Sequence, residues 1–289
     1  MSMRRALREI SSFGARRRQA STFALDHTYE GITVSSPSTG VVRVGLARPE
    51  RLNALSMAMG RSLLEVCARL EEAPAADVRC VILTGEGDRS FSTGRDLKES
   101  AAHNAEQARE YMTLCMDTAD AIRALPMPTI AAINGFCFGW GIEAALGADV
   151  RLAVDSATIC FPETSLGIFP GAGGTVLLPR LVGPAFAKEL IFSAKRVSGT
   201  EAADMGLVNH SMPLEDLAPT AEEMAAAFAS GGPLGARAAK RVIDSSMDMA
   251  TDSALRLSRA ERFPLNGTDD FAEGVRAFAE KRAPHFCGK

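Results

Sequence analysis

The chain has few histidines, no closely paired cysteines and no long apolar run, and each absence excludes a class of protein. The four histidines, His27, His103, His210 and His285, are scattered without the spacing of metal ligands, so we expect no metal site. The six cysteines never form a Cys-x-x-Cys pair, which favours free thiols over a disulfide framework. No apolar run approaches the ~20 residues that would span a bilayer.

The chain also lacks a strong charge of either sign. Its 32 basic and 35 acidic side chains give a net charge of -3, which provides no global reason to bind nucleic acid or an anionic membrane. We therefore expect neither partner. With 289 residues and a 46% hydrophobic fraction, the composition is that of a globular protein of one large or two small domains.

The N-terminal 28 residues differ in composition from the rest. Residues 1–25 are rich in arginine and serine, and Glu9 is their only acidic residue. This composition is typical of a mitochondrial transit segment, and a disordered basic arm is the alternative. The stretch 1–28 is therefore set apart from the fold. It predicts a location in the mitochondrial matrix, with the cytoplasm as the alternative.

Strands and helices alternate along the middle of the chain, and helices dominate its last third. Strands are predicted at 41–46, 78–84, 129–133, 150–154 and 158–161, and helices at about 56–70, 105–125 and 141–146. This order predicts an α/β core over residues 29–220 and an α-helical region over residues 221–289.

A first loop with functional potential follows the second predicted strand. It contains Ser92-Thr93-Gly94-Arg95-Asp96-Leu97. Gly94 allows a sharp turn, so that the next backbone N–H can point into a cavity. The alternative is a plain turn in which Asp96 caps a helix.

A second loop, rich in glycine, leads from the third predicted strand into a helix that carries Glu143. Gly139 and Gly141 permit close backbone approach, and the helix start directs free N–H groups at whatever lies above it. Glu143 would face the same cavity, although an ordinary helix-stabilising glutamate is the alternative. The pattern Gly139-x-Gly141-x-x-Ala144 also matches a dinucleotide-binding fingerprint. The helix that follows it is too short for the crossover that such a fold requires, which argues against this alternative.

A third loop carries Glu163. This glutamate follows Pro162 in an apolar neighbourhood, where desolvation would raise its pKa as proton transfer requires. A surface glutamate is the alternative interpretation.

Together these loops resemble the enoyl-CoA hydratase/isomerase (crotonase) superfamily. The resemblance rests on three motifs in this order: Phe91-x-x-Gly94-x-Asp96, Gly139-x-Gly141-x-Glu143, and Pro162-Glu163 with Pro170-Gly171-Ala172-Gly173-Gly174-Thr175. The segments 187–192 and 278–284 look like the hydratase branch that includes methylglutaconyl-CoA hydratase. The resemblance implies an α/β spiral of β-β-α repeats with a helical C-terminal trimerisation region, assembled as a homotrimer or homohexamer.

The resemblance also implies the roles of the site residues. It places an oxyanion hole on the backbone N–H groups of Arg95 and Trp140, where an acyl-CoA thioester carbonyl would accept both hydrogen bonds. It makes Glu143 and Glu163 a catalytic pair that holds a water over the double bond. Because family members with other chemistries often lack one of these acids, the pair predicts a hydro-lyase.

Coenzyme A, which is part of the substrate, is the expected ligand, and no separate cofactor is expected. The resemblance lines the path of coenzyme A with Arg51, Asn53, Ala54, Ser92, Thr93, Gly94, Asp96, Leu97, Gly139, Gly141, Phe278 and Lys281. Phe278 and Lys281 would reach it from a neighbouring subunit.

Two residues depart from the family pattern. Trp140 stands where the family usually has glycine, and Arg95 where it often has alanine, so the acyl pocket is expected to differ, with Trp140 narrowing it. The predicted function is hydration of the 2,3 double bond of an enoyl-CoA, in fatty-acid or branched-chain amino-acid breakdown. Isomerisation or other CoA-thioester chemistry is the alternative. An RNA-binding or scaffold protein is the alternative of another class, and the arginine-bearing helix near 59–70, which has no lysine, gives it little support.

Overall fold

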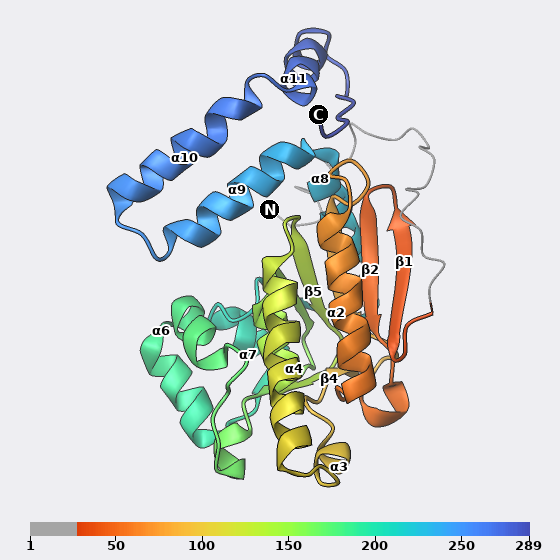
Figure 1. The fold of residues 1–289 in the computed structure, drawn as a ribbon, viewed down its shortest axis with the longest axis vertical. Coiled ribbons are helices and arrows are strands. Elements are labelled where there is room, and N and C mark those ends of the chain that lie inside the picture. The colour runs from red at the N-terminus through yellow and green to blue at the C-terminus, as the bar shows by residue number, and fades with distance from the viewer. Residues whose placement is uncertain (1–27) are drawn as a thin grey trace.

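The computed structural model describes residues 28–289. The predicted transit segment therefore lies, apart from its last residue, outside the described residues. Two sheets and the helices that cover them form the described part of the chain (Figure 1).

The larger sheet has six strands, and its strands are parallel except for an N-terminal hairpin. In spatial order they are β1 (Ile32–Ser38), β2 (Val41–Leu46), β3 (Cys80–Gly85), β5 (Thr129–Ile133), β7 (Val150–Val154) and β10 (His210–Met212). Only β1 and β2 pair antiparallel. All residues of β3 and β5 are buried, as expected for central strands of a parallel sheet.

The smaller sheet has four short strands. They are β4 (Ser90–Ser92), β6 (Phe136–Phe138), β8 (Thr158–Cys160) and β9 (Val197–Ser198). The pairs β3–β4, β5–β6 and β7–β8 each place one strand in each sheet before the chain turns into a helical segment. This is the predicted spiral of β-β-α repeats, and the predicted fold class is confirmed.

The helices cover the sheets and form the C-terminal end of the molecule. They are α2 (Met57–Glu72), α3 (Leu97–Ser100), α4 (Ala105–Ala124), α5 (Trp140–Leu146), α6 (Gly174–Ser193), α7 (Gly199–Asp204), α8 (Leu214–Ser230), α9 (Pro233–Ser246), α10 (Thr251–Leu265) and α11 (Asp269–Ala279). Two 3₁₀ turns, η1 (Pro49–Arg51) and η2 (Glu163–Leu166), lie in the loops. None of the helices in the described range is long and apolar enough to cross a membrane.

Side-chain caps define the start of the helices that flank the site. The Ser56 hydroxyl accepts from the Met59 N–H at 3.1 Å, and Asn104 and Gln107 form a reciprocal capping box at the start of α4. α2 and α4 then run side by side along the sheets (Figure 1). They hold the loop between β4 and α3 in place.

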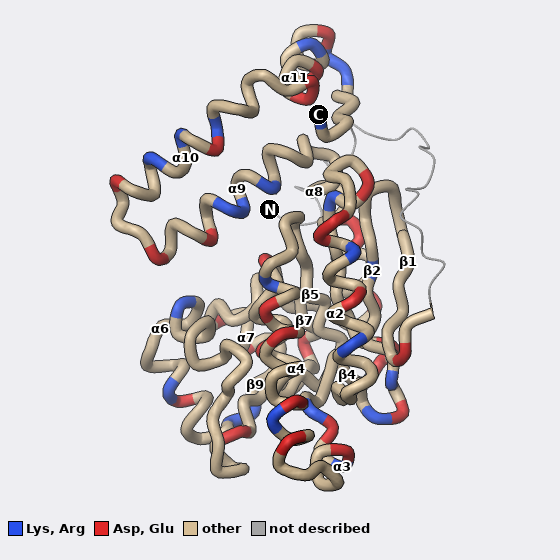
Figure 2. Tube along the Cα trace, in the orientation of Figure 1, with Lys and Arg blue, Asp and Glu red and all other residues tan. Residues whose placement is uncertain are grey.

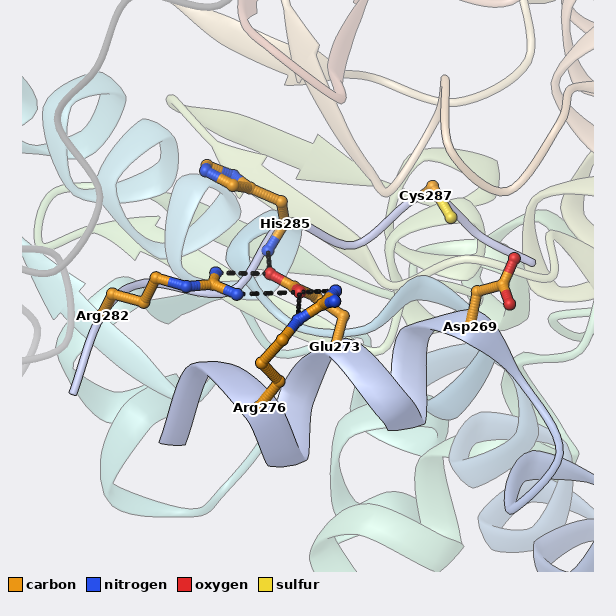
Figure 3. A pocket seen from close by; sticks show the side chains of 6 residues that line it. All are labelled: Asp269, Glu273, Arg276, Arg282, His285 and Cys287. Atoms are coloured by element: carbon orange, nitrogen blue, oxygen red, sulfur yellow. Dashed lines mark hydrogen bonds and ion pairs between the residues drawn. The ribbon is translucent and has the colours of Figure 1, made fainter. Parts of the chain in front are cut away.

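The C-terminal helices extend from one end of the core, away from α3 (Figure 1). The predicted boundary at residue 220 falls inside α8, and this helix packs on the strands of the larger sheet. In a hollow of about 560 Å³, Glu273 of α11 accepts from Arg276 and Arg282 at 2.6 Å each and from the His285 N–H at 2.8 Å (Figure 3). These bonds satisfy the Glu273 carboxylate and fold the chain end back onto α11.

Charged residues of both signs are interleaved along the elements of the described chain (Figure 2). Several are locally paired, as in the ion pair of Arg61 on α2 with Glu110 on α4 at 2.7 Å. Within the described residues the two signs are therefore mixed along the chain rather than gathered in separate acidic and basic regions.

Candidate active site

Two glycine turns approach each other closely at the centre of the site. Gly94 follows β4 with φ of 90°, and Gly139 follows β6 with φ of 53°. A Cβ atom at Gly94 would lie 2.9 Å from the Phe138 carbonyl oxygen and 3.4 Å from the Trp140 backbone nitrogen. Residue 94 must therefore be glycine, because a side chain would be strained at this positive φ and would clash with the Phe138 carbonyl.

The backbone N–H groups that follow these glycines are both free to bind a ligand. The Leu55 N–H donates to the Gly94 carbonyl, and the Leu55 carbonyl accepts from the Asp96 N–H. Because these two bonds lie on either side of Arg95, the Arg95 N–H points away from Leu55. Trp140 is the first residue of α5 and has no intrahelical acceptor. Among residues 28–289 neither N–H has an acceptor, and both lie beside the same pair of turns.

The Trp140 side chain is directed into the core. Its indole N–H donates to the Cys115 carbonyl and to the Thr118 hydroxyl of α4, at 3.0 Å each, and the residue is only 4% exposed. The tryptophan thereby connects α5 to α4 and fixes the turn that presents its own backbone N–H.

Glu143 lies one turn into α5 and is held by backbone donors. Its Oε1 accepts from the Ala172 N–H at 2.8 Å and from the Gly174 N–H at 2.9 Å. Burial raises the pKa of Glu143, and these two hydrogen bonds oppose that rise. A Cβ at residue 174 would lie 3.0 Å from Oε1, so the glycine allows this close approach.

Glu163 begins η2 and is buried without a matching set of donors. It is 8% exposed, and its Oε2 has no hydrogen-bond partner in the described part of the chain. Burial, together with the nearby charge of Glu143, raises the pKa of Glu163 to about 7. Its Oε1 lies 3.1 Å from the position of a Cβ at Gly139, so the carboxyl group lies against the Gly139 turn.

The residues expected along the coenzyme A path form a polar network beneath the first loop. Asn53 is fully buried, accepts from the Arg48 N–H and donates to the Glu86 and Ser90 carbonyls. Arg48 also donates to the Ala54 carbonyl at 2.6 Å. These bonds fix the positive φ of Asn53 and the course of the loop before α2.

Asp96 holds the two arginines and caps a helix at once. Its carboxylate accepts from Arg51 at 3.0 Å and from Arg48 at 3.2 Å, and also from the N–H groups at the start of α3. The capping role considered from the sequence is therefore present. Because Asp96 is buried and fully bonded, it positions the loop rather than offering a free carboxylate.

The other predicted residues divide between the turn and the far end of the molecule. The Ser92 hydroxyl accepts from the Gly94 N–H at 3.2 Å, the Thr93 N–H donates to the Leu52 carbonyl, and a Cβ at Gly141 would lie 2.4 Å from the Ser92 carbonyl oxygen. Leu97 is exposed beside this loop. Phe278 and Lys281 lie at the end of α11, and this chain does not bring them to its own site (Figure 1).

Two contributors were not identified from the sequence. One is Arg48, which donates hydrogen bonds to both Asn53 and Asp96. The other is Tyr111 of α4, whose hydroxyl donates to the Leu55 carbonyl in the loop before α2. The position of Arg48 directly before Pro49, in a loop that already carried candidates, was the available signal. Nothing in the sequence marked Tyr111, because its role depends on the contact of α4 with residues far along the chain.

The local fold does not match the dinucleotide-binding alternative. The glycines follow β6, a strand of the smaller sheet, and the helix after them has seven residues. The turn instead places two free N–H groups and two buried glutamates around one space. A fold of β-β-α repeats with this site defines an enzyme of the hydratase/isomerase superfamily.

Comparisons with known proteins identify the family. The family model described as enoyl-CoA hydratase/isomerase matches residues 36–289, and the chain belongs to this family. YngF of Bacillus subtilis (strain 168), whose name places it among enoyl-CoA hydratases/isomerases, is 44% identical over 247 residues, covering 85% of this chain and 94% of YngF. Mouse mitochondrial methylglutaconyl-CoA hydratase is 36% identical over 256 residues, covering 86% of this chain and 80% of the mouse protein. An enoyl-CoA hydratase structure from Bacillus anthracis matches with a TM-score of 0.87 at 39% identity, covering 90% of this chain and all of that one.

Proposed function

We propose that this protein is an enoyl-CoA hydratase, which adds water across the 2,3 double bond of an enoyl-CoA thioester. The observation that carries the proposal is the pair of buried glutamates, Glu143 and Glu163, beside a turn with two free N–H groups. Hydration needs a proton acceptor, a proton donor and stabilisation of an enolate oxygen. The site offers a glutamate for each of the two proton transfers and a pair of N–H groups for the enolate oxygen.

The two N–H groups would bind the thioester carbonyl oxygen. As water attacks the β carbon, negative charge develops on that oxygen, and the hydrogen bonds from Arg95 and Trp140 strengthen. One such donor contributes about 3–4 kcal/mol in other enzymes. Since the indole of Trp140 is fixed to α4, its backbone N–H is held in place before the reaction begins.

The two carboxyl groups would divide the proton transfers. Glu143, which accepts two backbone hydrogen bonds, is suited to act as the carboxylate that takes a proton from water. The water oxygen bonds to the β carbon, and Glu163 gives its proton to the α carbon. The pKa of about 7 leaves Glu163 partly protonated at neutral pH, as a proton donor requires. A proton must then return from Glu143 to Glu163, through water, to complete the cycle.

The test is the loss of absorbance of the conjugated enoyl thioester of crotonyl-CoA. Glu143→Gln and Glu163→Gln should each lower kcat by roughly 100-fold or more, because acid–base groups contribute at least that much. Glu222→Gln, the same substitution at an exposed glutamate of α8, is the matched control. Full activity in both site variants would exclude the mechanism, and a shifted double bond without added water would identify an isomerase. RNA binding without turnover would identify the non-enzymatic alternative.

We propose that the substrate is bound as its coenzyme A thioester along the loop from Ser92 to Leu97 and past Arg51. Arg51 is partly exposed and held by Asp96, so a positive charge is available at the edge of the site. A competition assay with free coenzyme A, comparing Arg51→Ala with the wild type, tests this placement. An unchanged inhibition constant would argue against it.

We propose that the chain assembles as a homotrimer or homohexamer in which Phe278 and Lys281 reach a neighbouring site. Exposed apolar side chains on the C-terminal helices support self-association, because exposed apolar patches mark interaction surfaces. They include Ile243, Met247, Leu255, Phe263, Val275 and Phe278. Light scattering of the wild type and of Phe263→Asp tests the proposal, since a monomeric wild type would exclude it.

We further propose a mitochondrial matrix location and a role in fatty-acid or branched-chain amino-acid breakdown. The composition of residues 1–28 and the mitochondrial relative support the location. Fusion of residues 1–28 to a fluorescent protein tests it. Diffuse cytoplasmic fluorescence would favour the alternative.

A further inference from the structure

The peptide group between Gly94 and Arg95 is bonded to the fold at one end only. Its carbonyl oxygen, on Gly94, accepts from the Leu55 N–H at 2.8 Å. Because the peptide is trans, its N–H points opposite to its carbonyl, and the free Arg95 N–H is therefore directed away from Leu55. The position of Leu55 thus decides where this N–H points.

Leu55 is in turn held by Tyr111 of α4. The Tyr111 hydroxyl donates to the Leu55 carbonyl and accepts from the Asp96 N–H at 3.1 Å. The Asp96 N–H also donates to the Leu55 carbonyl, at 2.9 Å. Tyr111 and Leu55 are both fully buried, so water does not compete for these bonds. One hydroxyl thereby fixes the residue that orients the Gly94–Arg95 peptide and the residue that follows Arg95.

The side chain of Arg95 contacts the same tyrosine. Its Cζ lies 5.7 Å from the centre of the Tyr111 ring, a distance at which a guanidinium is attracted to an aromatic face. The ring of His103 meets the Tyr111 ring edge-on, with centroids 5.3 Å apart. The tyrosine ring is thus packed from two directions, and Arg95 is tied to α4 through its side chain as well as through the backbone beside it.

The second free N–H is supported by the same face of α4. The Trp140 indole donates to the Cys115 carbonyl and the Thr118 hydroxyl at 3.0 Å each. Tyr111, Cys115 and Thr118 are successively four and three residues apart, the spacing of one helix face, and all three are buried. The hydrogen bonds within α4 keep a constant separation between the supports of the two turns.

We propose that Tyr111 is a positioning residue of the oxyanion hole, which holds the Arg95 N–H in register, through Leu55, from the helix face that also holds Trp140. The proposal rests on the proposed hydratase function and assigns the element that pre-organises its two donors. Pre-organised donors stabilise a developing oxyanion because they need no rearrangement during the reaction. A hydroxyl buried behind the site would thereby raise the rate without touching the substrate.

The hydroxyl of Tyr111 is suited to this role and not to proton transfer. Burial raises its pKa above the ordinary value of 10, so it keeps its proton at any pH at which the enzyme would be assayed. Its one proton is donated to Leu55, and it accepts from Asp96. We therefore expect Tyr111→Phe to change the height of the pH profile of kcat/KM but not its shape.

The kinetic test uses Tyr111→Phe, which removes the hydroxyl and keeps the ring below Arg95. The Leu55 carbonyl retains the Asp96 N–H, so the variant should fold. We expect kcat on crotonyl-CoA to fall by about 10- to 100-fold with little change in KM, because a misplaced donor costs most in the transition state. Tyr111→Leu, which also removes the ring, should lose at least as much.

The chain contains one other tyrosine, Tyr29, and Tyr29→Phe is the matched control. Its half-buried hydroxyl accepts from Arg69 of α2 at 2.5 Å, and neither residue belongs to the site. This variant should leave kcat unchanged. Unfolding temperatures of all variants show whether each is folded. If Tyr29→Phe and Tyr111→Phe lower kcat equally, the effect is one of general stability and the inference is overturned.

A direct readout is the infrared stretching frequency of the thioester carbonyl in bound butyryl-CoA labelled with ¹³C at that carbon, a ligand that cannot be hydrated. Hydrogen bonds from two fixed donors polarise this carbonyl, so its frequency should be lower in the wild type than in free butyryl-CoA. In Tyr111→Phe the lowering should be smaller. An equal lowering in the folded variant, or an altered pH profile, would overturn the inference. A wild type that lowers the frequency but hydrates no enoyl-CoA would overturn the proposed function and leave the role of Tyr111 standing.

Discussion

The carboxyl groups of Glu143 and Glu163 lie in the same site but differ in their hydrogen bonding. Two backbone N–H groups donate to Glu143, whereas Oε2 of Glu163 has no donor within the described residues. Both groups are buried, which raises both pKa values. Two backbone N–H groups from another loop oppose the rise at Glu143, whereas at Glu163 only its own backbone N–H does so. Two nearby carboxyl groups in unlike surroundings are the arrangement in which one is ionised and the other protonated.

The first prediction concerns the pH dependence of the rate. If Glu163 donates a proton, kcat/KM should fall as pH rises through about 7, because the protonated fraction of Glu163 falls over that range. Stopped-flow or steady-state rates on the substrate between pH 5 and 9 measure this limb. In Glu163→Gln the residual activity should lose the limb. A limb that persists unchanged in that variant would assign it to another group.

The second prediction concerns stability. The pKa of Glu163 in the folded protein, about 7, lies above its ordinary value of 4.5, so the folded chain retains a proton that the unfolded chain releases. The free energy of unfolding should therefore decrease as pH rises from about 4.5 through about 7. Glu163→Gln removes this dependence. Denaturant unfolding of both proteins at pH 5 and pH 8 gives the comparison, and equal losses of stability would contradict it.

The third prediction tests the close approach of the two turns. Gly94→Ala adds a methyl group 2.9 Å from the Phe138 carbonyl oxygen and must move the turn that carries the Arg95 N–H. Loss of one oxyanion donor should lower kcat by about 100- to 1,000-fold. Gly206→Ala is the control, because Gly206 also has positive φ, at 79°, but has no atom within 4 Å of the added methyl group. It should affect stability alone, and a similar loss of kcat there would point to backbone strain instead.

The fourth prediction concerns the indole of Trp140. Trp140→Phe removes the hydrogen bonds that the indole donates to the Cys115 carbonyl and the Thr118 hydroxyl, although Thr118 still donates to that carbonyl. The loss of a buried hydrogen bond of this kind costs about 0.5–1.5 kcal/mol. Because Thr118→Val removes one of these acceptors, the double variant should be less destabilised than the sum of the two single variants. Chemical denaturation of the four proteins measures the difference. Strict additivity would show that the indole and the hydroxyl do not interact.

Local sequence patterns predicted several elements that are long enough to show a hydrophobic pattern or a cap. The strands at 129–133 and 150–154 have the same bounds in the structure, and the helix capped by Ser56 begins where its capping residue indicates. The strands of the smaller sheet, β4, β6 and β9, were not predicted. They have two or three residues each, too few to show a hydrophobic period. Their pairing depends on the larger sheet, which brings these short segments next to one another.

The sequence by itself determined the order of the three loops, the two glutamates and the two glycines, because these depend on residue type and on local backbone freedom. Only the tertiary structure decided how each group behaves. It directed Trp140 into the core, satisfied Asp96 with two arginines and placed the Arg95 guanidinium over the Tyr111 ring. Such outcomes depend on contacts between residues far apart in the chain, and burial and hydrogen bonding, rather than residue type, then set the charge and reach of each side chain.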